Sequence, residues 1–67
     1  QSSVWNAKSL LLLAKNYYSL NDPFQAIFVL DSLIKNFKTY DQIVSEAQLL
    51  KTKFEDLLKN KNQNDDG

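Results

Sequence analysis

Apolar residues recur at helical spacing in three separate segments of the chain. In the first, over residues 3–20, four positions follow the i, i+3, i+4, i+7 pattern of one helix face, namely Leu10, Leu13, Ala14 and Tyr17. In the second, the corresponding positions are Ala26, Leu30, Leu33 and Phe37. In the third, they are Tyr40, Ile43, Val44, Ala47, Leu50, Phe54, Leu57 and Leu58. The pattern therefore predicts an all-α chain with three helices.

The segments between these patterns carry helix-ending and helix-starting residues. Asn21 tolerates the left-handed conformation at a helix C-terminus, Asp22 can cap the second helix, and Pro23 suits the first helical position. So short a turn makes the first two helices antiparallel neighbours. Thr39 and Gln42 have the spacing of a capping box, which predicts that the third helix starts near Thr39.

These signals divide the chain into three parts. Residues 3–38 form a helical hairpin, residues 39–59 a further helix that packs on the second one and caps the hairpin, and residues 60–67 a polar tail that we expect to be disordered. The expected fold is an antiparallel three-helix arrangement.

The stretch from Ala7 to Phe37 resembles one tetratricopeptide repeat. The residues that carry the resemblance are Leu10, Leu13, Ala14 and Tyr17, followed by Ala26, Leu30 and Leu33. The chain departs from the family pattern at Pro23, at Leu33, which is larger than usual, and at Lys38, where proline commonly closes the repeat. With the third helix added, the chain looks like the C-terminal end of bacterial multi-repeat proteins, many of which serve in cell-envelope assemblies. The resemblance implies a protein-interaction scaffold, and a hairpin of this kind normally stacks on neighbouring repeats.

The amino-acid composition argues against several other functions. The chain of 67 residues has 8 Lys and no Arg against 8 acidic residues, and this net charge of zero disfavours nucleic-acid binding. It has no His and no Cys, so thiol, triad and Cys2His2-type zinc chemistry lack their parts. Apolar runs such as Leu10 to Ala14, which none in the chain exceeds in length, are far too short to span a bilayer. We therefore expect neither an enzyme nor a cofactor, a metal site or a membrane span.

The first helix is apolar on a second side as well. Val4, Trp5, Leu11, Leu12 and Tyr18 lie opposite the first stripe, and the second helix can cover only one of the two sides. An uncovered apolar side with Trp and Tyr is typical of an interface. In the tetratricopeptide family the first helix of a repeat lines the ligand groove. Together these arguments give the candidate partner-binding residues Trp5, Lys8, Leu11, Leu12, Lys15, Tyr18 and Ser19.

Two interpretations of that side remain open at this stage. The first is a scaffold that binds a protein or peptide segment, or a neighbouring repeat, through the apolar face of its first helix. The second is a purely structural capping or oligomerisation element of a longer array, covered by an upstream repeat or by a second copy. The chain opens at Gln1 without an initiating Met, so we expect a piece of a longer protein.

Overall fold

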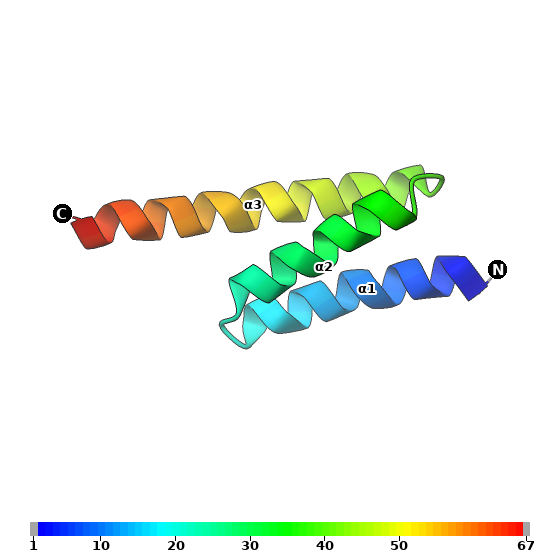
Figure 1. Ribbon diagram of the computed structural model, residues 1–67, viewed down its shortest axis with the longest axis horizontal. Coiled ribbons are helices and arrows are strands. Elements are labelled where there is room, and N and C mark those ends of the chain that lie inside the picture. The colour runs from blue at the N-terminus through cyan, green and yellow to red at the C-terminus, as the bar shows by residue number, and fades with distance from the viewer. Residues whose placement is uncertain (1, 67) are drawn as a thin grey trace.

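The computed structural model of the chain contains three helices, α1 (Ser2–Ser19), α2 (Pro23–Asn36) and α3 (Asp41–Asp66). It describes the backbone of residues 2–66 and the side chains of residues 3–60. α1 and α3 run in the same direction and α2 runs against both (Figure 1). The predicted all-α, antiparallel three-helix arrangement is confirmed over the described residues.

The turn between α1 and α2 forms as the sequence predicts. Asn21 adopts a φ of 66°, and its backbone N–H donates to the Tyr18 carbonyl at 3.0 Å. The N–H of Asp22 donates to the Tyr17 carbonyl at 2.9 Å, and these two bonds together make a Schellman motif. The Asp22 side chain then accepts from the backbone N–H of Gln25, which starts α2. One short segment thus ends the first helix and caps the second.

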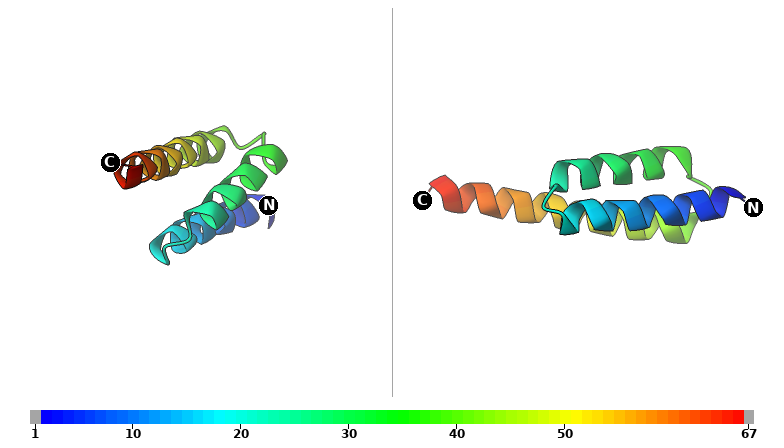
Figure 2. Two further views of the ribbon diagram at one scale, coloured as in Figure 1. Left: turned by 60° about the vertical axis from the view of Figure 1, so that its left-hand side comes forward. Right: turned by 90° about the horizontal axis from the view of Figure 1, so that it is seen from below.

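α2 is the central helix and packs against both of the others, whereas α1 and α3 touch each other only sparingly. In the right-hand view of Figure 2, α2 forms one layer and α1 and α3 overlap in the other. The connected core contains residues of all three helices, namely Leu11, Ala14, Ala26, Val29, Leu30, Leu33, Ala47 and Phe54. The small alanines let the helices approach closely, and the fully buried Leu30 and Leu33 fill the centre.

The start of α3 differs from the expectation. The helix begins at Asp41, and the Val44 N–H donates to the Tyr40 carbonyl at 2.9 Å, so Tyr40 is the capping position. The capping box expected between Thr39 and Gln42 is therefore wrong. The N–H of Tyr40 donates to the Phe37 carbonyl instead, which holds residues 37–40 in a turn and leaves Thr39 before the helix.

The end of α3 also differs, because the helix continues to Asp66 through most of the segment that we expected as a disordered tail. The apolar repeat ends at Leu58, which marks where packing stops, but no Pro or Gly interrupts the backbone before Gly67. The ladder of backbone hydrogen bonds can therefore run on past the last packed residue. In Figure 1 this part of α3 extends beyond the turn between α1 and α2.

Among the side chains that the structure describes, two ion pairs join α3 to the hairpin. Lys51 Nζ lies 2.6 Å from Asp31 Oδ1 of α2, and Lys15 Nζ of α1 lies 3.3 Å from Glu46 Oε2. The hydrogen bond to Asp31 raises the pKa of Lys51 above its ordinary value, with the charges of Asp31 and Glu55 adding to the effect and desolvation opposing it. The pairs connect α3 to both other helices and help to fix its register.

Candidate protein-interaction surface

The buried side of α1 lies between the two apolar stripes that the sequence suggests. Ala7 and Ala14 are fully buried, and Leu11, which we expected to face a partner, is only 8% exposed. Leu13, expected in the core, is 39% exposed. The expectation fails for these two leucines because α1 packs against α3 as well as against α2. The middle of the buried side of α1 therefore faces both helices and not α2 alone.

Tyr18 is likewise part of the chain's own packing. Its ring stacks on that of Phe54, with ring centroids 4.1 Å apart and planes 5° from parallel. Phe54 is buried, and Tyr18 is half-buried against the core. The sequence argument assumed that only α2 could cover α1, whereas Tyr18 packs against α3.

The opposite side of α1 remains open to solvent. Trp5 is 67% exposed, Leu12 62% and Leu20 76%, and the partly exposed Leu13 lies beside them. At 100° per residue, these four side chains share an arc of about 100° with two exposed polar residues. We call this arc the outer face of α1, made of Trp5, Ser9, Leu12, Leu13 and Asn16 together with Leu20, which directly follows the last residue of the helix, Ser19.

The remaining candidate residues border the outer face. Lys8 is exposed and its Nζ lies 5.1 Å from the centroid of the Trp5 ring, a cation–π contact that restrains the indole. Lys15 is paired with Glu46, and Ser19 is exposed near the end of the helix. The structure thus brings Trp5 and Leu12 together on one open face, with Lys8 at its edge.

The sequence argument did not assign Leu13 and Leu20 to this face. A signal for them is present, because Leu13 and Leu20 repeat the seven-residue spacing of Trp5 and Leu12. The other strongly exposed apolar side chains are divided between α2, which carries Phe24 and Phe28, and α3, which carries Leu49 and Leu57. The outer face of α1 is therefore the largest group of exposed apolar residues on one helix of the described chain.

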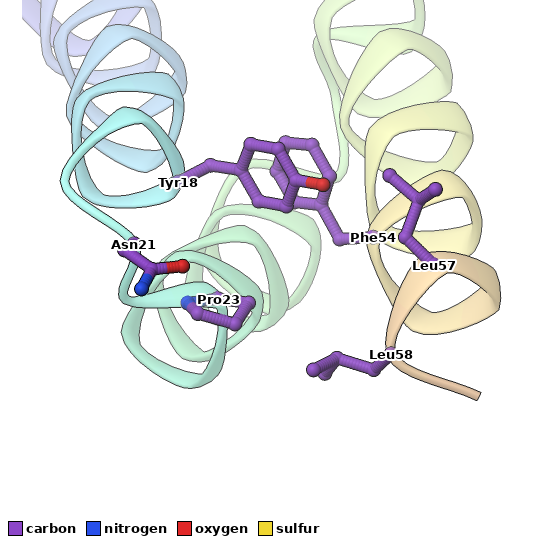
Figure 3. A pocket seen from close by; sticks show the side chains of 6 residues that line it. All are labelled: Tyr18, Asn21, Pro23, Phe54, Leu57 and Leu58. Carbon is purple, nitrogen blue, oxygen red and sulfur yellow. The ribbon is translucent and has the colours of Figure 1, made fainter. Parts of the chain in front are cut away.

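A small cleft lies at the end of the bundle where α3 passes the turn between α1 and α2. Its volume is about 150 Å³, and Figure 3 shows the Tyr18 and Phe54 rings forming one wall. The other lining residues are Asn21, Pro23, Leu57 and Leu58. An apolar cavity of this volume accommodates a group the size of benzene. The cleft lies away from Trp5, so it is a feature separate from most of the outer face.

The structure describes the side chains of residues 3–60. Among those residues, no group of three or more Asp, Glu, His or Cys side chains is placed to hold a metal ion. None of the described helices combines the length and apolar character that crossing a bilayer requires.

No family model matches this chain, and no curated protein and no solved structure is significantly similar to it.

Proposed function

We propose that this chain is a protein-interaction module that docks a partner helix against the outer face of α1. The observation that carries the proposal is a correspondence between α1 and α3, which run in the same direction. Leu13 and Leu20 lie 34 residues before Ala47 and Phe54, which are the buried residues of α3 among the side chains that the structure describes. In α3, these two positions pack into the core. The corresponding positions in α1 and directly after it are leucines that no described helix covers.

The correspondence also supports the direction of docking. α3 lies antiparallel to α2, with Ala47 and Phe54 in the core they share. A partner helix that covers Leu13 and Leu20 in the same manner would run antiparallel to α1. Burying a leucine side chain completely contributes about 1.5–3 kcal/mol, so Leu12, Leu13 and Leu20 offer enough apolar surface to favour association.

The tetratricopeptide resemblance agrees with this proposal. The offset of 34 residues equals the period of that repeat, in which each hairpin covers the apolar face of the next. The alternative from the sequence, a purely structural element of a longer helical array, uses the same face with the preceding hairpin as its permanent neighbour. The two hypotheses differ in one respect. An interaction module binds its partner helix reversibly, whereas a structural element keeps its neighbouring helix permanently.

A direct test uses a synthetic peptide with the sequence of residues 22–38. This segment contains α2, the helix against which α3 packs, so it should cover the corresponding positions of α1. A lactam bridge on its solvent side keeps the peptide helical. Trp5 is the only tryptophan, so its emission reports on the outer face. We expect a blue shift on titration and at least tenfold weaker binding for Leu20→Glu, because Leu20 corresponds to the buried Phe54. Leu49→Glu is the matched control, because Leu49 is 73% exposed but lies on α3. Equal binding by both variants would contradict the proposal.

A further inference from the structure

The exposed residues of the outer face are arranged symmetrically along α1. Trp5 and Leu20 lie at equal distances from the midpoint between Leu12 and Leu13. The two exposed polar residues, Ser9 and Asn16, are also equidistant from that midpoint. A helix surface whose pattern is the same in both directions can match a second copy of itself when the two helices run antiparallel.

We infer that the partner of the outer face is a second copy of this chain, with the two α1 helices packed antiparallel about a two-fold axis between residues 12 and 13. This inference rests on the proposed function, since it names the occupant of the same face. Leu12 and Leu13 of both copies surround the axis. Trp5 of one copy lies beside Leu20 of the second copy at each end.

The polar residues on the face fit this register. Ser9 of one copy lies opposite Asn16 of the second copy, and a hydroxyl and an amide can exchange a hydrogen bond there. In the opposite, parallel arrangement, each Ser9 and each Asn16 would meet its own counterpart, and Trp5 would meet Trp5. The antiparallel register instead places the large indole beside the smaller Leu20 and gives both polar residues a complementary neighbour.

The charges of α1 are compatible with self-association. The six residues of the outer face carry no charge, so two copies bring no like charges into the centre of the contact. α1 has two charged residues, Lys8 and Lys15. Lys15 is paired with Glu46 of its own chain, and Lys8 lies over the Trp5 ring at the edge of the face. The contact therefore desolvates no unpaired charge at its centre.

The size of the face suits a weak, reversible dimer. The exposed parts of its four apolar side chains amount to on the order of 500 Å² per copy, so two copies bury on the order of 1,000 Å², near the lower limit for a specific interface. The contact between Lys8 and Trp5 restrains the indole before association, which lowers the entropy lost on binding.

Sedimentation equilibrium between about 1 µM and about 1 mM tests whether the chain dimerises. We expect a monomer–dimer equilibrium, with the Trp5 emission shifting to the blue over the same concentration range. Leu12→Glu should remain monomeric throughout, whereas Leu49→Glu should dimerise like the unaltered chain. A monomer at all concentrations, or a dimer that Leu12→Glu leaves intact, overturns the inference.

Disulfide trapping tests the register, because the chain contains no cysteine of its own. Ser9→Cys and Asn16→Cys should form a mixed disulfide when the two variants are combined. Each variant alone should not cross-link, since identical positions are about 10 Å apart along the antiparallel helices. Thr52→Cys, exposed on α3, serves as the control for random collisions. Cross-linking of each variant with itself would indicate parallel helices and contradict the inferred arrangement.

The two experiments separate this inference from the proposed function. If the chain stays monomeric but Leu20→Glu still weakens binding of the helical peptide, the second copy is not the partner, while the proposal of helix docking is retained. If Leu20→Glu leaves peptide binding unchanged and Leu12→Glu leaves self-association unchanged or undetected, both proposals fail.

Discussion

Tyr18 of α1 and Phe54 of α3 stack face to face, with ring centroids 4.1 Å apart. They join the two helices that otherwise touch least, and they close the end of the core near the α1–α2 turn. The contact lies on the buried side of α1, whereas the apolar residues of the outer face are open to solvent.

Replacing Phe54 with Ala should destabilise the fold severely. Phe54 is buried, and Phe→Ala substitutions in cores cost about 3–5 kcal/mol. The total stability of a chain this small is about 3–10 kcal/mol. We expect Phe54→Ala to be largely unfolded at 37 °C and Phe54→Leu to remain folded with a lowered midpoint in urea, both followed by circular dichroism. A Phe54→Ala variant as stable as the original would show that α3 does not dock as described.

Leu11 and Leu12 are neighbours in sequence and should respond oppositely to the same substitution. Leu11→Glu places a carboxylate among buried side chains and should unfold the protein or cost more than about 3 kcal/mol. Leu12→Glu lies in solvent and should change the free energy of unfolding of the monomer by about 0.5 kcal/mol or less. Urea denaturation at low protein concentration provides the measurement. Similar losses in both variants would mean that the buried side of α1 has been misassigned.

Asn21 provides a test of the turn. Its φ of 66° is unfavourable for a residue with a Cβ and no local side-chain hydrogen bond, so Asn21→Ala should cost about 1 kcal/mol. Asn21→Gly should be equal to the original or slightly more stable, because glycine adopts this conformation without a steric penalty. Thermal unfolding of the pair gives the comparison, and a tolerated alanine would exclude a left-handed Asn21 in solution.

The ion pair of Lys51 with Asp31 should stabilise the fold only while the lysine is charged. Its pKa is higher in the folded chain than in the unfolded one, so its contribution is fully present below the ordinary lysine value of about 10.4 and is lost as the pH rises through the raised pKa. We expect Lys51→Met to be less stable than the original chain by about 1 kcal/mol or less at about pH 9.

The stability difference between Lys51→Met and the original chain should become smaller as the pH rises beyond the raised pKa of Lys51. Lys53→Met is the matched control, since Lys53 is exposed on the same helix. Urea denaturation across the alkaline range measures both variants. A difference between Lys51→Met and the original chain that does not depend on pH would rule out the ion pair as its source.

Local sequence determines most of the secondary structure of this protein. The spacing of apolar residues gives three helices, and Asn21, Asp22 and Pro23 give the turn and the start of α2, because capping and backbone preferences act within a few residues. The same local signals were misleading at the ends of α3. A capping-box pattern at Thr39 competes with the turn that Phe37 and Tyr40 form, and the loss of apolar residues after Leu58 does not by itself end a helix.

The inward side of α1 is decided only by the tertiary structure. Leu10, Leu11, Leu12 and Leu13 are successive leucines, and at 100° per residue they point almost all round the helix. Their chemistry is identical, so sequence alone cannot say which of them is buried. The selection is made by α2 and α3 together, which cover Leu11 and Tyr18 and leave Trp5, Leu12 and Leu20 in solvent. Burial depends on the position of both neighbouring helices, and that position is a property of the folded chain.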